Sequence, residues 1–455
     1  MDGEGEDASK VIHVKFVTKL YPPFKAPVSS VVIPSNVTRL GLSSIVNSLL
    51  TLEKPEAFDF LIDGELIRMS LEQFLLAKGI SAERTLEIEY IRAVAPRKEE
   101  KPSLHDDWVS AVDGSSPRFI LTGCYDGLGR YASAYVFSYC CQHLQESYIF
   151  KKFPLIRIWS SPGSCTHILE GHTGAISSVA FVNFQGGESV TVATASKDRT
   201  LRLFKVDTAE SGDSTTRVRA YKILRGHKAS VQSVVAEKHG NMVCSSSWDC
   251  TINLWNTDES ESELSVSGKK RKGNNQAEEA QLEGEAVTTF VGHTQCVSSV
   301  VWPEEDVIYS CSWDHSVRRW DVPTGKDTLN LYCGKALNTV DVGGEGSALV
   351  AAGGSDPILR VWDPRKPGTS APVFQFSSHA SWISACKWHE SSWFHLLSAS
   401  YDGKIMLWDL RTAWPLSIID THKDKVLCAD WWKGDSVVSG GADSNLRISS
   451  GISIS

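Results

Sequence analysis

The sequence predicts a mostly β protein, in which seven repeated sheets follow a small domain of mixed strands and helices. The main observation is a recurring pattern: a small residue and any residue precede an Asp, and an aromatic residue stands six positions after that Asp. The turn Asp recurs seven times, which is within the known range of blades in a β-propeller. Residues 11–92 lack this pattern and show strand and helix periodicity instead.

The Asp of the pattern has a physical role in a tight turn between two antiparallel strands. Its short side chain can accept hydrogen bonds from neighbouring backbone N–H groups. The aromatic residue then lies in the following strand, and an upstream His lies in the loop that enters the blade. The seven turn residues are Asp126, Asp198, Asp249, Asp314, Asp356, Asp402 and Asp443.

These features resemble the WD40 repeat. The resemblance implies that His, Ser, Asp and Trp form one buried hydrogen-bonded chain in each blade, a network that stabilises only when every member has a partner. In the last copy Ser449 stands in place of the aromatic residue, and we expect residues 91–102 to supply the final strand there. The best copies give His227–Ser247–Asp249–Trp255, His293–Ser312–Asp314–Trp320 and His379–Ser400–Asp402–Trp408.

The composition is that of an ordinary globular protein, with 42% hydrophobic and 22% charged residues. A net charge of -8 argues against a chain that coats bare nucleic acid, although it leaves room for a local basic surface. The 11 Cys residues form no C-x-x-C pair, and no apolar signal core or membrane-spanning run is present. We therefore expect a reducing compartment and no membrane.

The front domain shows the order of a ubiquitin-like β-grasp. Strands are predicted near residues 11–16, 28–34, 58–62 and 85–90, and helices over residues 40–52 and from Ser70 onward. Ser70 and Gln73 have the spacing of a capping box. Together with the repeats, this domain resembles the NLE domain. The resemblance rests on residues 58–64, 71–75, 79–83 and 87–90.

The expected organisation has four parts. Residues 1–10 form a disordered acidic tail, residues 11–92 the NLE domain, residues 93–103 a linker, and residues 104–455 the seven-bladed WD40 propeller.

Two insertions interrupt the repeats. Residues 131–157 break a strand of the first blade, and we interpret them as an artefact of splicing or of the gene model, with a genuine ordered insertion as the alternative. Residues 258–285 are polar and predicted to be a disordered loop. That loop contains a candidate nuclear import signal, for which a solvated charge run is an equal alternative. The signal consists of Lys269, Lys270, Arg271 and Lys272.

No residue pattern indicates an enzyme, a bound metal or a cofactor. Ser, His and Asp recur together, but seven equivalent copies are explained by the repeat and not by catalysis. His389-Glu390 with His395 misses the spacing of a zinc-binding helix. The W-D-x-R patterns that end at Arg365 and Arg411 resemble a box for docking on a cullin ubiquitin-ligase adaptor. A surface ion pair at a strand end explains both more simply.

The order of the two domains resembles the family of WD-repeat subunits of the PeBoW complex. This resemblance implies a nucleolar and nucleoplasmic factor for assembly of the large ribosomal subunit and processing of its rRNA. The partners implied are pescadillo, the block-of-proliferation protein and the pre-ribosomal large subunit. Direct contact with RNA stays open.

The resemblance also implies a partner for the front domain. In NLE families one carboxylate completes the Mg²⁺ site of the MIDAS domain of midasin, an AAA ATPase, and a hard cation suits such an oxygen ligand. The family motif places this residue at Glu83, with Glu87 and Glu89 as weaker candidates because they lie in a strand. The alternatives are a cullin-ligase substrate receptor and a reader of histone peptides.

Overall fold

A computed structural model of the protein describes most of residues 11–452. The exceptions are residues 28, 52–55, 57, 68, 82–83, 93–97, 101, 126–154, 162–163, 184–188, 208–214, 259–281, 345, 347, 367–370, 412–414 and 421. The acidic tail, Asp126, Glu83 and residues 269–272 therefore lie outside the described part of the chain. A smaller compact unit is built on Met1–Lys98, and a larger one on Glu99–Met406 and Ile418–Ser450.

The smaller unit folds one mixed five-stranded sheet against helices. The sheet order is β2-β1-β5-β3-β4, with β1 parallel to β5 and antiparallel to β2. The elements are β1 (Val11–Val17), β2 (Ser30–Pro34), α1 (Arg39–Leu50), β3 (Phe58–Ile62), β4 (Glu65–Leu66), α2 (Leu71–Lys78) and β5 (Leu86–Arg92).

Alternation of apolar residues along β1 and β5 builds the core of this unit. Val14, Phe16 and Ile88 are fully or almost fully buried, and Phe58 packs edge-on against Tyr90 at 5.5 Å between ring centroids. Helix α2 begins with the predicted capping box, in which the Ser70 hydroxyl accepts from the Gln73 backbone and the Gln73 side chain accepts from the Ser70 backbone. That prediction is confirmed.

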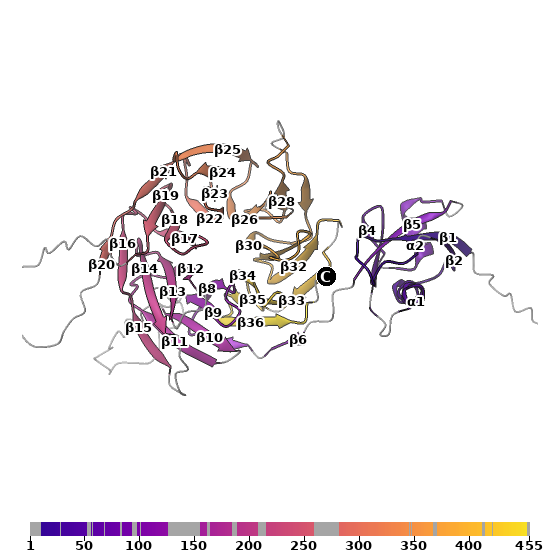
Figure 1. Ribbon diagram of the computed structural model, residues 1–455, viewed down its shortest axis with the longest axis horizontal. Coiled ribbons are helices and arrows are strands. Elements are labelled where there is room, and N and C mark those ends of the chain that lie inside the picture. The colour runs from indigo at the N-terminus through magenta and orange to yellow at the C-terminus, as the bar shows by residue number, and fades with distance from the viewer. Residues whose placement is uncertain are drawn as a thin grey trace, which may run out of the picture. The chain divides into compact units, whose positions relative to one another are not determined.

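The described residues after 97 form seven sheets, numbered here in chain order (Figure 1). Sheets 1 and 2 each gain a fifth strand from a later connection. Sheet 1 contains β8 (Val109–Asp113), β9 (Ile120–Cys124), β10 (Ile156–Ser161), β11 (Ser164–Glu170) and β15 (Thr216–Arg219). Sheet 2 contains β12 (Ile176–Asn183), β13 (Ser189–Ser196), β14 (Thr200–Asp207), β16 (Lys222–Arg225) and β20 (Leu282–Gly284).

The other five sheets follow the same antiparallel plan. Sheet 3 contains β17 (Val231–Ala236), β18 (Met242–Ser247), β19 (Thr251–Asn256) and β21 (Thr288–Val291), and sheet 4 contains β22 (Val297–Glu304), β23 (Val307–Ser312), β24 (Ser316–Asp321) and β25 (Lys326–Tyr332). Sheet 5 contains β26 (Leu337–Gly343), β27 (Leu349–Gly354), β28 (Leu359–Trp362) and β29 (Phe374–Phe376), and sheet 6 contains β30 (Ile383–Trp388), β31 (His395–Ser400), β32 (Lys404–Asp409) and β33 (Ser417–Asp420). Sheet 7 contains β34 (Val426–Trp432), β35 (Ser436–Gly441), β36 (Asn445–Ser450) and β6 (Lys98–Glu99), with β7 (Ser103–Leu104) also on β36.

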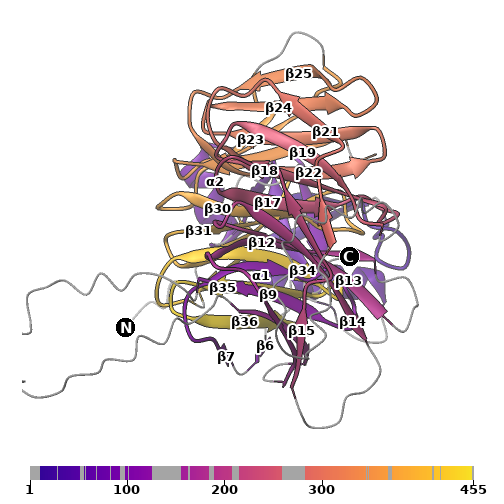
Figure 2. The same ribbon diagram turned by 90° about the vertical axis from the view of Figure 1, so that its left-hand side faces the viewer.

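The first strands of the seven sheets stand side by side around a common centre, and β34 of sheet 7 lies next to β8 of sheet 1 (Figures 1 and 2). Carboxylates join neighbouring inner strands through backbone N–H groups. Asp113 accepts from Phe181 at 2.7 Å, and Asp341 accepts from Trp388 at 2.7 Å. A third such bond joins sheet 7 to sheet 1, because Asp430 accepts from the Gly114 N–H at 2.9 Å.

Part of the predicted linker is a strand of the ring. The amide of Glu100 donates to the Ile448 carbonyl at 3.2 Å, and the amide of His105 donates to the Ser444 carbonyl at 2.9 Å. The expectation that residues 91–102 supply the last strand of sheet 7 is confirmed at β6, and the pairing extends beyond them through β7. Within the predicted linker, residues 98–99 and 103 therefore pair with β36 of sheet 7.

The predicted insertions lie mostly outside the described residues, but strands occur near the end of each. Ile156 and Arg157 lie in β10 and pair with Gly123 and Thr122 of β9. The loop predicted for residues 258–285 ends earlier, because β20 pairs in parallel with β16 of sheet 2. Pairing with the buried strand β9 places the start of β10 at Ile156. Pairing with β16 at the edge of sheet 2 places β20 at Leu282–Gly284, because an edge strand has backbone groups free to pair.

Candidate functional site: the inner rim and the networks beneath it

Buried networks hold the loops at one end of the ring. In five sheets a His Nδ1 lies 2.8–3.0 Å from a turn Asp, and its Nε2 lies 2.7–2.8 Å from a Ser or Thr hydroxyl. These sets are His172–Thr194–Asp198, His227–Ser245–Asp249, His293–Ser310–Asp314, His379–Ser398–Asp402 and His422–Ser439–Asp443.

Where a Trp ends the network, as in sheets 3 and 4, the direction of its hydrogen bonds follows from the two ends. The indole N–H of Trp255 can only donate, and it lies 2.8 Å from the Ser245 hydroxyl oxygen. Ser245 must then donate to Nε2 of His227, which leaves the ring hydrogen on Nδ1 for the Asp249 carboxylate, an acceptor. A neutral His in one tautomer therefore satisfies every group of the chain.

The predicted serines of these chains are wrong by two positions. The serine bound to His227 is Ser245 and not Ser247. Ser247 instead caps the turn, because its hydroxyl accepts from the Asp249 amide and donates to the Ser230 carbonyl. Successive side chains of a strand face opposite sides, so residues two apart share a face, and sequence alone leaves the choice between them open. The same shift holds elsewhere: Ser310 replaces Ser312, and Ser398 replaces Ser400.

The turn carboxylates are strongly anionic. Burial by itself would raise the pKa of each carboxyl group, but hydrogen bonds from the His and from nearby backbone and hydroxyl groups outweigh it. They lower the pKa of Asp402 and Asp443 to about 2. The pKa of Asp198, Asp249 and Asp314 falls further below its usual value, because these residues also accept from a Thr or Ser hydroxyl.

Sheets 1 and 5 lack this network among the described residues. In sheet 1 the His105 ring contacts the Cys124 thiol at 2.8 Å, and burial next to Arg157 lowers the pKa of His105 to about 3. In sheet 5 the turn carboxylate of Asp356 instead binds the buried Arg360 guanidinium at 2.6 Å.

The networks position a ring of paired residues, which we call the inner rim. In every sheet the residue before the turn Asp donates its backbone N–H to the carbonyl of the residue before the innermost strand, at 2.8–3.0 Å. The pairs are Trp108–Tyr125, Ala175–Lys197, Ser230–Trp248, Cys296–Trp313, Ala336–Ser355, Trp382–Tyr401 and Lys425–Ala442.

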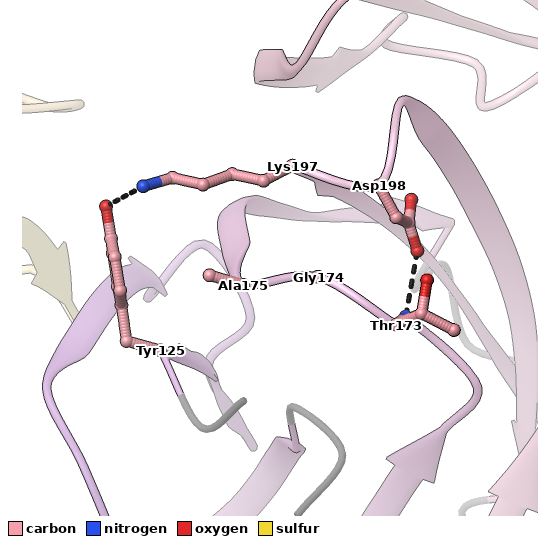
Figure 3. Close-up of a pocket in the computed structure, with 6 residues that line it drawn as sticks. All are labelled: Tyr125, Thr173, Gly174, Ala175, Lys197 and Asp198. Carbon is pink, nitrogen blue, oxygen red and sulfur yellow. Dashed lines mark hydrogen bonds between the residues drawn. The ribbon is translucent and has the colours of Figure 1, made fainter. Parts of the chain in front are cut away.

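Neighbouring sheets also touch across the rim. The Lys197 ammonium reaches the Tyr125 hydroxyl and lies 4.2 Å from the centroid of that ring (Figure 3). Trp248 and Trp313 meet edge-on, with ring centroids 4.9 Å apart. The sequence contained a signal for these rim contacts. The repeat pattern allows any residue before the turn Asp, and four repeats have an aromatic residue there, namely Tyr125, Trp248, Trp313 and Tyr401.

Two of the three candidate carboxylates of the front domain form ion pairs with lysines. Glu87 is bound to Lys15 at 2.8 Å across the parallel strands β5 and β1. Glu89 is mostly covered and lies 3.7 Å from Lys19. Glu83 lies outside the described residues. Of the three candidates, the two that the structure describes already have a cationic partner.

Both W-D-x-R arginines bind the Asp of their own motif. Arg365 donates from Nε and Nη2 to Asp363 at 2.9 and 3.1 Å, and its side chain is 55% exposed. Arg411 makes the same bidentate contact with Asp409, with Nη2 at 2.5 Å, but only 9% of its side chain is exposed. This geometry is that of the ion pair at a strand end.

Within the described part of the chain, no group of three or more His, Cys, Asp or Glu residues is placed to hold a metal ion. Neither α1 nor α2 has the length and apolar character that a membrane crossing requires.

Comparison with known proteins covers the whole chain. The NLE (NUC135) domain family matches residues 12–75, and the WD domain, G-beta repeat family matches residues 163–205, 219–256, 284–321 and 370–409. The ribosome biogenesis protein WDR12 homolog of Arabidopsis thaliana is 80% identical over 460 residues, which is 100% of both chains. The WDR12 homolog of Oryza sativa subsp. japonica is 59% identical over 461 residues, and the ribosome biogenesis protein YTM1 of Eremothecium gossypii is 31% identical over 487 residues, each spanning 99% of both chains.

The four repeat matches fall on sheets 2, 3, 4 and 6. These sheets carry the His, the hydroxyl, the Asp and a buried aromatic residue together, namely Phe204, Trp255, Trp320 or Trp408. Sheet 7 has the first three but ends with Ser449. The sheets that deviate from the pattern are therefore the ones that the family description misses.

We predict that Asp314→Ala lowers the free energy of unfolding by about 3 kcal/mol, because His293, the Thr294 amide and Ser316 lose a charged acceptor. Asp327→Ala is the control, since that carboxylate is half-exposed and binds only Arg318 among the contacts described; its loss should be about 1 kcal/mol or less. Urea unfolding measures both. Equal effects would contradict the role of the network.

We predict that acid unfolds the ring mainly below pH 4. A carboxyl group whose pKa is lower in the folded state contributes stability above its unfolded value of 3.8, and this is lost as pH falls toward about 2. Buried His172, whose pKa is lowered by burial, adds a loss that begins below 6.5. The urea midpoint should fall steeply between pH 4 and pH 2. Asp443→Asn should flatten this slope, and an unchanged slope would be inconsistent with the network.

The two arginine motifs form a matched pair for a third prediction. Arg411→Ala should lower stability by about 3 kcal/mol, since it leaves the Asp409 carboxylate, which is fully buried, without its guanidinium. Arg365→Ala should change stability by about 1 kcal/mol or less, because the Arg365 side chain is 55% exposed and its ion pair with Asp363 is screened by water. Thermal or urea unfolding separates the variants, and two equally mild losses would refute this assignment.

Proposed function

Because the chain belongs to the family of ribosome biogenesis proteins that contains the WDR12 homologues and YTM1, we propose that it is a non-enzymatic assembly factor of the large ribosomal subunit. The observation that carries this proposal is the likeness over the full length, which includes both the NLE domain and the repeats. The factor acts in processing of the large-subunit rRNA.

The larger unit is the scaffold of the PeBoW complex in this proposal, and binds pescadillo and the block-of-proliferation protein. It acts as a closed seven-bladed propeller. The supporting observations are the seven sheets of the described residues and the bond between Asp430 and Gly114, which joins the last sheet to the first. A ring without free inner edges is rigid, and can hold partners in a fixed geometry.

The front domain is the handle by which midasin removes the factor. Its sheet order and the parallel pair β1–β5 support a ubiquitin-like grasp. Glu83 is the proposed ligand of the MIDAS cation. The ion pairs of Glu87 with Lys15 and of Glu89 with Lys19 favour Glu83 over those two residues, since a carboxylate already bound to ammonium is a poorer ligand.

The order of the chain supplies a path for force. Residues 93–97 lead from β5 of the front domain into β6 and β7, which pair with β36. A pull on the front domain therefore acts first on the strands that close sheet 7. Removal by an ATPase then begins at the edge of the ring.

The proposed location is the nucleus, with nucleolar and nucleoplasmic pools. The import signal assigned to Lys269, Lys270, Arg271 and Lys272 would serve this purpose. The alternative of a cullin-ligase receptor is disfavoured, because the guanidinium of Arg411 is buried on Asp409 and that of Arg365 is held by Asp363.

We predict that Glu83→Ala abolishes capture of midasin by the full-length protein, since the MIDAS cation loses its ligand. Glu87→Ala is the matched control: it lies in the same domain and should retain capture. Affinity purification followed by immunoblotting measures midasin and the two PeBoW partners together. Both variants should keep pescadillo and the block-of-proliferation protein. Undiminished midasin in the Glu83→Ala sample would refute the assignment.

A further inference from the structure

The inner rim exposes several large aromatic side chains. Trp108, Trp248 and Trp382 are 44%, 47% and 48% exposed. Trp248 stands edge-on to Trp313, and Trp382 is stacked on Tyr401 at 6.1 Å between centroids. Large exposed apolar groups that gather on one face mark a binding surface.

The charges of the rim have one sign. Lys197 and Lys425 are the two charged residues among the rim positions, all of which are described, and no rim position is acidic. Lys425 lies over the Tyr401 ring at 5.4 Å, as Lys197 lies over Tyr125. The chain as a whole carries a net charge of -8, so this face departs from the average of the molecule.

The loops next to the rim add to this bias. Exposed lysines stand at Lys228, Lys335 and Lys423. The acidic neighbours Asp107 and Asp424 accept from the backbone amides of Trp108 and Lys425, which partly occupies their oxygens. Five turn aspartates are bonded to a His beneath the rim, and Asp356 is bonded to Arg360. The face therefore offers ring faces and ammonium groups together.

We propose that the inner rim binds single-stranded RNA, with bases stacked on Trp108, Trp248 and Trp382 and phosphates held by the surrounding lysines. Sequence-tolerant binding of single strands uses this combination of aromatic platforms and a basic track. A pocket of about 320 Å³ between Tyr125 and Asp198 lies on the same face, and the Lys197 side chain that lines it extends to the Tyr125 hydroxyl (Figure 3). It gives room for a base beside Tyr125.

The backbone of the rim favours RNA over an extended acidic peptide. In every pair the N–H of one residue is already bonded to the carbonyl of the other, which removes one donor and one acceptor per pair from those that could bind a peptide strand. Stacking and phosphate contacts require only side chains. This inference goes beyond the proposed assembly role and does not depend on midasin.

The test uses the purified full-length protein and a labelled oligouridine of about twelve nucleotides, a length that spans several stacked bases. Fluorescence anisotropy should show that the double variant Trp248→Ala/Trp313→Ala weakens binding about tenfold or more. The charge variant Lys197→Glu/Lys425→Glu should weaken it too, and more so at low salt. A duplex of the same length should bind more weakly than the single strand.

Trp393→Ala is the matched control. This residue is 46% exposed but lies in the connection between β30 and β31, at the opposite end of the inner strand from Trp382. It should leave RNA affinity unchanged. Thermal melting of every variant confirms that the fold is retained, and the charge variant provides a second readout if the aromatic one unfolds.

Three results would overturn the proposal. One is equal RNA affinity in the wild type and in both rim variants. Another is binding of the duplex or of heparin as tightly as the single strand, with no effect of the Trp changes, which would indicate charge alone. The third is loss of the PeBoW partners by a folded rim variant that keeps its RNA affinity, which would make the rim a protein-docking surface.

Discussion

The ring depends on the pairing between β36, near the end of the chain, and residues 98–104, which precede the first sheet. Sheet 7 has β34, β35 and β36 of its own and lacks an outer partner until the earlier segment fills it. The hydrogen bond from the Gly114 amide to Asp430 joins the innermost strand of sheet 7 to the end of the innermost strand of sheet 1. Because the two ends of the repeated region meet in one sheet, we expect the seven sheets to unfold together and not as independent repeats.

Closure fixes the ring, and the buried networks fix what the ring displays. In five sheets a His joins a hydroxyl to a carboxylate, and this ties the entry loop to the turn before β14, β19, β24, β32 or β36. The loop and the turn carry the residues of the inner rim. The same hydrogen bonds therefore stabilise the fold and hold the rim side chains in place. Replacing a turn Asp should lower the stability and also disturb the rim. The WD40 sequence pattern reflects the network, while positions that it leaves free carry the rim side chains to which we assign RNA binding.

The sequence predicted the architecture better than the details of pairing. The turn Asp and the upstream His were found because their roles demand fixed residue types, and the capping box at Ser70 was found for the same reason. The hydroxyl partner was placed at Ser247 and is Ser245, because residues two apart on a strand face the same side. The strand at Leu282–Gly284 was missed, since its pairing with sheet 2 depends on a distant edge. Such non-local contacts leave no local periodicity.

Hydrogen exchange across the closing segment tests the account most directly. The amides of Glu100 and His105 donate to carbonyls of Ile448 and Ser444, so they should exchange as slowly as those inside β36 and become exposed together with them. Peptides that cover residues 98–105 and 445–450 report this by mass spectrometry. Rapid exchange of residues 98–105 while β36 stays protected would contradict a ring closed by this segment.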